Sequence, residues 1–137
     1  MPSQAPTVIP ALQYDDAPAA IAFLKDAFGF EAVSVHEGPE GTIAHAELRS
    51  GTGMVMLGSR PNARDQERIH QPAGGSSIYV IVEDADAHFE RATKAAATIT
   101  RPIHDTDYGS REYTAEDLEG NLWSFGTYRP SLEGSSS

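Results

Sequence analysis

The strongest constraint on the fold of this chain is an internal repeat in the order of its secondary-structure elements. Residues 8–58 and residues 77–128 each show a predicted strand, a helix and three further strands. Asp16 and Asp84 stand 68 positions apart, and each is placed to cap the helix that follows the first strand of its half. The same offset aligns His45 with Tyr113 and Leu57 with Phe125. One order of elements at one offset predicts two βαβββ modules.

Alternating apolar residues indicate the strands, and capping residues indicate the ends of the first helix. Asp16 is followed by Pro18, which is tolerated in a first helical turn, and Gly29 follows the last apolar residue of the helix. The second helix is expected over residues 85–96. The strands are expected at residues 8–14, 30–36, 42–48, 54–57, 77–82, 98–103, 112–115 and 122–127.

The predicted fold class is α+β, in one domain of two modules. Residues 1–7 are predicted to be a flexible N-terminus, and residues 129–137 a flexible tail. Residues 59–76 are polar and rich in Gly and Pro, so they are predicted to link the modules. A ferredoxin-like repeat is the structural alternative, although its order of elements would be βαββαβ.

Composition excludes several classes of function. The chain has 137 residues and no cysteine, so neither disulfides nor thiolate metal ligands are available. Its formal net charge of −10 argues against nucleic acid and anionic membrane surfaces as partners. No apolar run approaches the length of about 20 residues that a membrane-spanning helix needs. No signal peptide is visible, so the cytoplasm is the expected location.

A mixed set of side chains is predicted on the sheet face opposite the helices. Ile81 belongs to this set, as do small, aromatic, sulfur-containing and ionisable residues, a mixture that suits a small-molecule ligand better than a packed core. The alternative is that this face meets water or a partner subunit. The predicted ligand-binding residues are His45, Glu47, Met54, Met56, Tyr79, Arg111, Tyr113 and Ser124.

Two pairs in this set carry candidate chemistry. His45 and Glu47 point the same way from one strand, so they could act as a base with its orienting acid or as ligands of an unusual metal site. A surface histidine is the ordinary alternative. Arg111 could hold a carboxylate, stack on an aromatic ring or form a salt bridge with Glu47, and Tyr113 could stack or donate a hydrogen bond. No chemistry is assigned to His36, His70, His88 or His104, and no catalytic residue is predicted.

Three short motifs within residues 8–128 resemble those of the vicinal oxygen chelate superfamily, the group of glyoxalases, bleomycin-resistance proteins and extradiol dioxygenases. They are Asp-x-x-x-Ala-Ile-x-Phe at residues 16–23, Phe-Gly-Phe at residues 28–30, and Asp-x-x-Gly-Asn-x-Trp at residues 117–123. The resemblance implies two modules that form a curled mixed sheet with a U-shaped cleft and helices on the outer face. It also implies a homodimer, and a divalent metal in enzymatic members.

The metal positions that the resemblance implies are occupied here by Ile9, Met56, Ser77 and Ser124. Isoleucine offers no ligand atom, and methionine and serine are poor ligands for a hard divalent cation. The usual metal centre is therefore predicted to be absent, with no other cofactor expected.

The resulting hypothesis is a metal-free binding protein that resembles the antibiotic-resistance branch and sequesters a partly aromatic small molecule between its modules. The alternative is a lyase or isomerase with an atypical metal or acid–base site around His45 and Glu47. A third hypothesis is a small interaction protein whose mixed face is covered by a partner.

Overall fold

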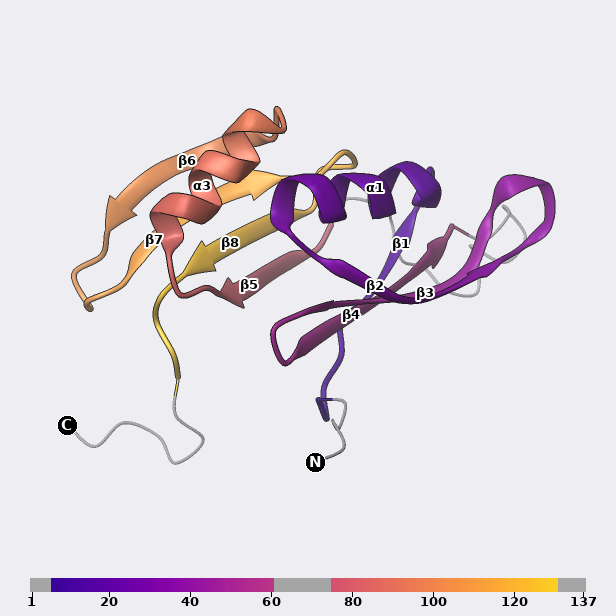
Figure 1. The fold of residues 1–137 in the computed structure, drawn as a ribbon, viewed down its shortest axis with the longest axis horizontal. Helices are drawn as coiled ribbons and strands as arrows, with labels where there is room; N and C mark the ends of the chain where they lie inside the picture. Colours follow the sequence, from indigo (N-terminus) through magenta and orange to yellow (C-terminus); the bar gives the residue numbers. More distant parts are fainter. Residues whose placement is uncertain (1–5, 61–74, 131–137) are drawn as a thin grey trace.

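The computed structural model describes residues 6–60 and 75–130, and it contains the two expected modules (Figure 1). The first module comprises β1 (Ala11–Tyr14), α1 (Ala17–Phe28), β2 (Glu31–Glu37), the short 3-10 turn η1 (Pro39–Gly41), β3 (Ile43–Ser50) and β4 (Gly53–Ser59). The second comprises β5 (Ser77–Ile81), α3 (Ala85–Lys94), β6 (Thr98–Asp105), β7 (Arg111–Glu116) and β8 (Leu122–Gly126). Most of the predicted linker, and much of both predicted flexible ends, lie outside the described residues.

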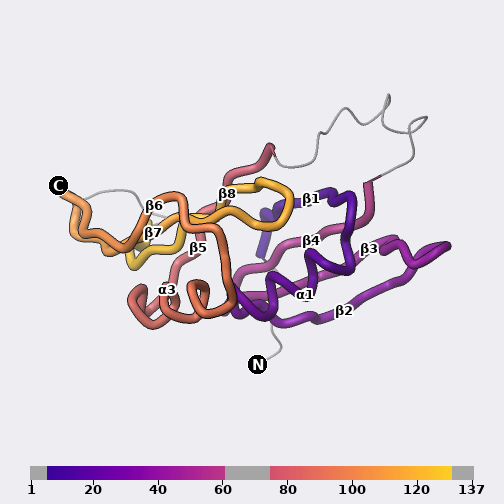
Figure 2. Tube along the Cα trace, turned by 90° about the horizontal axis from the view of Figure 1, so that it is seen from above, coloured from indigo at the N-terminus to yellow at the C-terminus, as the bar shows by residue number. Residues whose placement is uncertain are grey.

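Each module contributes one four-stranded mixed sheet, and the two sheets have the same topology. The strand orders are β1-β4-β3-β2 and β5-β8-β7-β6. The first strand of each module pairs in parallel with the last, and the other pairings are antiparallel. Figure 2 shows the two modules side by side along the molecule. The duplicated α+β fold is confirmed, and the ferredoxin-like order is excluded. No helix in the described ranges is long and apolar enough to cross a membrane.

The repeat is not in one register throughout, because the two β-hairpins differ in loop length. Leu57 pairs with Ala46, and Phe125, which lies 68 positions after Leu57, pairs with Tyr113. Tyr113 therefore corresponds to Ala46, at an offset of 67, and not to His45. Four residues separate the paired Arg49 and Met54 in the first hairpin. Five separate the paired Glu116 and Leu122 in the second.

This single extra residue reverses the faces predicted for β7, since neighbouring residues of a strand point to opposite sides. Tyr113 is fully buried in the core on the helix-facing side, and Arg111 shares that side. The face predicted for Arg111 and Tyr113 is therefore wrong. Glu112 and Thr114 occupy the opposite side, which we call the open face of each sheet.

The cores of the two modules merge where the helices meet. Phe28, at the end of α1, has its ring centroid 4.8 Å from that of Phe125 and 5.8 Å from that of Trp123 in the second module. Phe30 also meets Trp123, at 5.4 Å. Because each sheet has one face covered by its own helix, contact between the helices gives the two modules one continuous apolar core (Figure 1).

The second module caps both ends of α1. At the N-terminus, the carboxylate of Glu119 accepts hydrogen bonds from the backbone N–H groups of Asp15 and Asp16 at 2.6 and 2.8 Å. At the C-terminus, the Arg91 guanidinium donates to the carbonyls of Lys25 and Asp26, both at 3.2 Å. A carboxylate at the start of a helix and a cation at its end both complement the helix dipole. The position of α1 is therefore fixed by the neighbouring module.

Asp117 forms a second joint beside the start of α1. This buried carboxylate accepts hydrogen bonds from Tyr14, Trp123 and Asn121 side chains and from the backbone N–H groups of Glu119 and Asn121. Tyr14 ends β1, so its hydroxyl, 2.5 Å from Asp117 Oδ2, ties the first module to the hairpin of the second. The Asp-x-x-Gly-Asn-x-Trp motif is thus a joint between the modules.

His88 on α3 has a structural role that the sequence did not suggest. Its Nε2 lies 3.0 Å from the carbonyl of Phe28, and its Nδ1 lies 2.5 Å from the Tyr113 hydroxyl. A neutral ring that donates from Nε2 and accepts at Nδ1 satisfies both partners. Burial lowers the pKa of His88, and the nearby Arg91 guanidinium lowers it further, against the opposing effect of the Phe28 carbonyl.

We expect His88 to make the folded state less stable as the solution becomes acidic. The unfolded chain binds a proton at His88 near pH 6.5, whereas the folded chain takes it up only at lower pH. The stability that neutral His88 gives the folded state is therefore fully present above about pH 6.5. It is lost as the pH falls from there towards the pKa of His88 in the folded state. Urea unfolding between pH 7.5 and 5.5 should show a smaller loss of stability in His88→Gln. Equal losses in both proteins would contradict this role.

Candidate functional site

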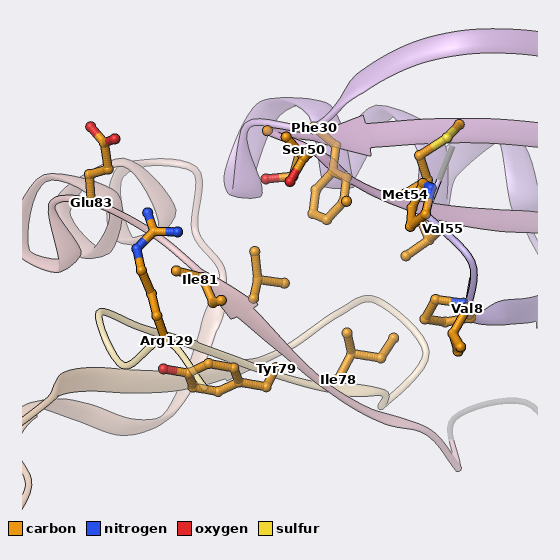
Figure 3. A pocket seen from close by; sticks show the side chains of 16 residues that line it. Val8, Phe30, Ser50, Met54, Val55, Ile78, Tyr79, Ile81, Glu83 and Arg129 are labelled. Carbon is orange, nitrogen blue, oxygen red and sulfur yellow. The ribbon is translucent and has the colours of Figure 1, made fainter. Parts of the chain in front are cut away.

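A cavity of about 580 Å³ lies between the two modules (Figure 3). One wall comes from the segment before β1, the residue before β2 and the β3–β4 hairpin, and includes Val8, Phe30, Met54 and Val55. The opposite wall is β5, with Ile78, Tyr79, Val80 and Ile81. Glu83 and Arg129 stand together at the end away from Val8. The cavity thus combines apolar walls with ionisable groups at one rim.

The free edge of β5 gives this cavity its shape. In the part of the chain that the structure describes, β5 pairs with β8 alone. Consecutive residues of β5 line the cavity although they point to opposite faces of the sheet, so the cavity runs along the strand edge. Across from it, a tight turn joins the paired Ser50 and Gly53, and Gly51 in that turn has a φ of 59°, which glycine adopts without strain.

The structure brings two of the eight predicted ligand-binding residues to the cavity, Met54 and Tyr79. Both lie on the open faces of their sheets, as the alternation of side chains predicted. The other six lie away from the cavity lining: His45, Glu47, Met56 and Ser124 on the open faces, and Arg111 and Tyr113 on the helix-facing side.

His45 and Glu47 form a surface cluster with neighbouring strand β2. His45 Nε2 lies 3.0 Å from Glu47 Oε2, so the predicted pair is in contact. The ring of His36 stacks on that of His45, with centroids 6.2 Å apart, and Ser34 Oγ lies 2.8 Å from His36 Nε2. These groups satisfy one another at a half-exposed site, and none of them is among the described residues that line the cavity.

Arg111 and Tyr113 both bond to other residues on the helix-facing side. The Arg111 guanidinium contacts Asp105 at 2.9 Å and Asp86 at 3.0 Å, and not the predicted partner Glu47. Hydrogen bonds to Asp105 and Asp86 raise the pKa of Arg111. Burial raises the pKa of Tyr113, so its hydroxyl stays protonated and bonds to His88.

The residues at the metal positions implied by the family resemblance do not fit a divalent cation. Ile9 has no ligand atom, and Met56 offers only a thioether. The hydroxyl of Ser124 lies 2.9 Å from that of Thr114, and Ser77 adds one more neutral oxygen. Among residues 6–60 and 75–130, no group of three or more His, Cys, Asp or Glu side chains is arranged to hold a metal ion.

Several cavity residues were not among the predicted ligand-binding residues, notably Phe30, Ile81 and Arg129. Alternation along the strand did place Ile81 on the same face as Tyr79. No comparable signal exists for Phe30 or Arg129, because their approach to β5 depends on how the modules dock. Phe30 in particular belongs to the first module, whereas β5 belongs to the second.

Comparison with known proteins places this architecture in a family. The family model described as the Glyoxalase/Bleomycin resistance protein/Dioxygenase superfamily matches residues 7–125. An uncharacterised protein of Mycobacterium bovis is 33% identical over 133 residues, which covers 88% of this chain and 82% of the relative.

Solved structures agree with the family model. TioX from Micromonospora sp. ML1 is 32% identical, with a TM-score of 0.72 over 93% of this chain and 99% of that chain. A bleomycin-binding protein from Streptomyces verticillus, solved with copper(II)-bleomycin, is 24% identical and has a TM-score of 0.64 over 92% of this chain and 98% of that chain. The likeness to the second protein shows the shared fold alone. This chain belongs to the Glyoxalase/Bleomycin resistance protein/Dioxygenase superfamily.

Proposed function

We propose that this protein is a metal-free binding protein that sequesters a small, partly aromatic molecule in the cavity between its modules. The cavity itself is the observation that carries the proposal. Its volume of about 580 Å³ falls within the range of about 300–1,000 Å³ that is common for small-molecule sites. Apolar walls with a few polar groups at one rim suit a ligand with a large apolar body.

The residues on the two walls favour an aromatic body. Tyr79 exposes its ring on one wall, the largely buried Phe30 ring forms part of the other, and Met54 adds a flexible thioether that adapts to flat ligands. Ile81 is 37% exposed, and a ligand that covered it would remove apolar surface from water. The walls therefore offer stacking and apolar contact more than directed hydrogen bonds.

The family and the charge of the chain support a drug-like ligand. A bleomycin-binding protein of the same fold was solved with copper(II)-bleomycin, which supports a small-molecule ligand. A net charge of −10 favours neutral or cationic ligands over anionic ones. We therefore propose a role in antibiotic resistance, exercised in the cytoplasm by a homodimer. Sedimentation of the purified protein would test the homodimer.

Charging the wall of the cavity should weaken ligand binding. Ile81→Asp places a carboxylate against the bound apolar body, and we expect the affinity for the neutral fluorophore Nile red, and for copper(II)-bleomycin, to fall at least about tenfold. Val33→Asp is the matched control, because Val33 is also an exposed apolar strand residue but lies outside the cavity. Fluorescence and calorimetric titrations would measure both affinities.

An equal loss in the two variants, or none in either, would contradict a ligand site in this cavity. The metal-free part of the proposal has its own test, which is elemental analysis together with thermal unfolding in Ni²⁺, Zn²⁺, Mn²⁺ and Fe²⁺. A metal that binds the native state would raise its stability. Stoichiometric metal that is lost in His45→Ala would favour the enzymatic alternative at His45 and Glu47.

A further inference from the structure

The hydroxyls of two tyrosines meet one carboxylate on the open face of the second sheet, and a third tyrosine packs beside them. Tyr108 donates its hydroxyl to Glu112 Oε2 at 3.0 Å, and the Tyr79 hydroxyl lies 3.4 Å from the same oxygen. The Tyr79 hydroxyl also donates to the carbonyl of Tyr128 at 3.1 Å. The Tyr108 and Tyr128 rings meet at an interplanar angle of 83°, with centroids 5.5 Å apart. We call these four residues the tyrosine cluster.

Gly126 on β8 makes room for the tyrosine cluster. Gly126 pairs with Glu112 on one side and with Ile81 on the other. A Cβ atom there would lie 2.5 Å from the Tyr79 hydroxyl and 2.6 Å from Glu112 Cγ, so any side chain would displace both groups. The absence of a side chain allows Tyr79 and Glu112 to meet above the strand.

The cluster is held in place but remains open to solvent. Ser110 Oγ accepts a hydrogen bond from the backbone N–H of Tyr128 at 3.1 Å, which ties the end of the second sheet to the loop that carries Tyr108. Even so, Tyr108 is 56% exposed, Tyr128 46% and Tyr79 40%. Large apolar rings that are fixed yet exposed offer a preformed surface for a ligand group.

The charge at the centre of the cluster is negative and uncompensated. Within the described parts of the chain, no Lys, Arg or His side chain forms an ion pair with Glu112. Its carboxylate instead accepts a hydrogen bond from the neutral phenol of Tyr108, and this hydrogen bond raises the pKa of Tyr108. Aromatic rings around a carboxylate attract an alkylated ammonium group, through the ring faces and through direct charge attraction.

The tyrosine cluster adjoins the cavity. Tyr79 belongs to both, and Ile81, which lines the cavity, is separated from Glu112 only by Gly126 in the sheet. In Figure 3 the Tyr79 hydroxyl points away from Val8, towards the end of the cavity where Arg129 lies. A ligand whose aromatic body fills the cavity could therefore reach Glu112 with a short arm.

We propose that the tyrosine cluster is a recognition site for an alkylated ammonium group, so that the ligand of this protein is an aromatic molecule with a cationic arm. The inference rests on the proposed function for the aromatic body but adds a separate subsite with its own chemistry. Among the described residues that line the cavity, Arg129 is the one cationic side chain, and it opposes the binding of a cation beside Tyr79.

The test uses choline and its uncharged carbon analogue 3,3-dimethylbutan-1-ol, titrated into the full-length protein by NMR at constant ionic strength. Choline should bind measurably and the analogue at least about tenfold more weakly, since the two differ in charge and hardly in shape. Glu112→Gln should weaken the binding of choline at least about tenfold. Glu116→Gln is the matched control, because Glu116 lies further along β7 on the same open face.

Three further variants separate the contribution of the rings from that of the charge. Tyr108→Leu should weaken choline severalfold, whereas Tyr108→Phe keeps the ring and should retain most of the affinity. Arg129→Gln should strengthen choline binding, because it removes the opposing cation. Equal binding of choline and its analogue, or equal losses in Glu112→Gln and Glu116→Gln, would overturn the proposal. The Nile red titrations of Ile81→Asp report on the cavity alone, so they distinguish failure of this subsite from failure of the proposed function.

Discussion

The Asp117→Asn variant is expected to lose about 3–5 kcal/mol of unfolding free energy, although it preserves the size and shape of the side chain. Asp117 Oδ2 accepts three hydrogen bonds, from the Tyr14 hydroxyl at 2.5 Å and from Trp123 Nε1 and Asn121 Nδ2, both at 3.0 Å. Asp117 Oδ1 accepts two more, from the backbone N–H groups of Glu119 and Asn121. The Asp117 carboxylate is buried, and the groups that bond to it are all hydrogen-bond donors.

An asparagine cannot satisfy this site in either orientation. Its single oxygen can replace Oδ2 or Oδ1, and its amino group then faces the donors at the other position. At least two buried or partly buried donors lose their acceptor, each at a cost of about 1–3 kcal/mol. Such a loss is large against the total of about 5–15 kcal/mol that stabilises a typical domain.

Urea unfolding would measure the loss, with Tyr14→Phe as the comparison. Tyr14→Phe removes one donor and leaves the carboxylate with four, so we expect it to cost only about 1–2 kcal/mol. If Asp117→Asn were no less stable than Tyr14→Phe, the carboxylate would not be the joint that the hydrogen bonds indicate.

The order of the elements was readable from the sequence because each element depends on local signals. Asp16 and Asp84 cap the helices as predicted, each accepting a hydrogen bond from the backbone three residues later. Gly29 ends α1 with a φ of 77°, a conformation that glycine adopts readily. These choices require only a few neighbouring residues, so they can be inferred without any knowledge of the tertiary structure.

The sequence did not predict which side chains of β7 lie on each face of the sheet, because this depends on the length of the hairpin loop that sets the strand register. The second hairpin holds one residue more than the first, and a shift of one residue exchanges the two sides of a strand. The predicted set therefore contained Arg111 and Tyr113 where the open face holds Glu112 and Thr114. The tyrosine cluster around Glu112 was missed for the same reason.

The location of the cavity could not be predicted from the sequence either, since it depends on how the modules dock against each other. Glu119 and Arg91 of the other module anchor α1 at both ends, and the docked modules bring Phe30 and Val8 opposite β5. Residues so far apart in the chain share no local pattern. The same anchoring has a functional consequence, because a fixed α1 leaves the two walls of the cavity in place before a ligand arrives.

Phe28→Ala should reveal whether the two modules unfold as one unit. Phe28 is buried where the cores merge and its ring packs on Phe125 and Trp123, so its loss should cost about 3–5 kcal/mol. Trp123 is the single tryptophan, and it reports on the second module, whereas Phe28 belongs to the first.

If the modules share one core, the urea midpoint of tryptophan fluorescence should fall as far as that of far-ultraviolet circular dichroism. Phe89→Ala is the control, because Phe89 is only partly buried and its ring contacts Tyr113 within its own module, so the expected cost is smaller. A fluorescence midpoint that stays at the wild-type value in Phe28→Ala would mean that the second module folds without the first. The cavity walls could then move independently, and the ligand would have to bring them together at a cost in affinity.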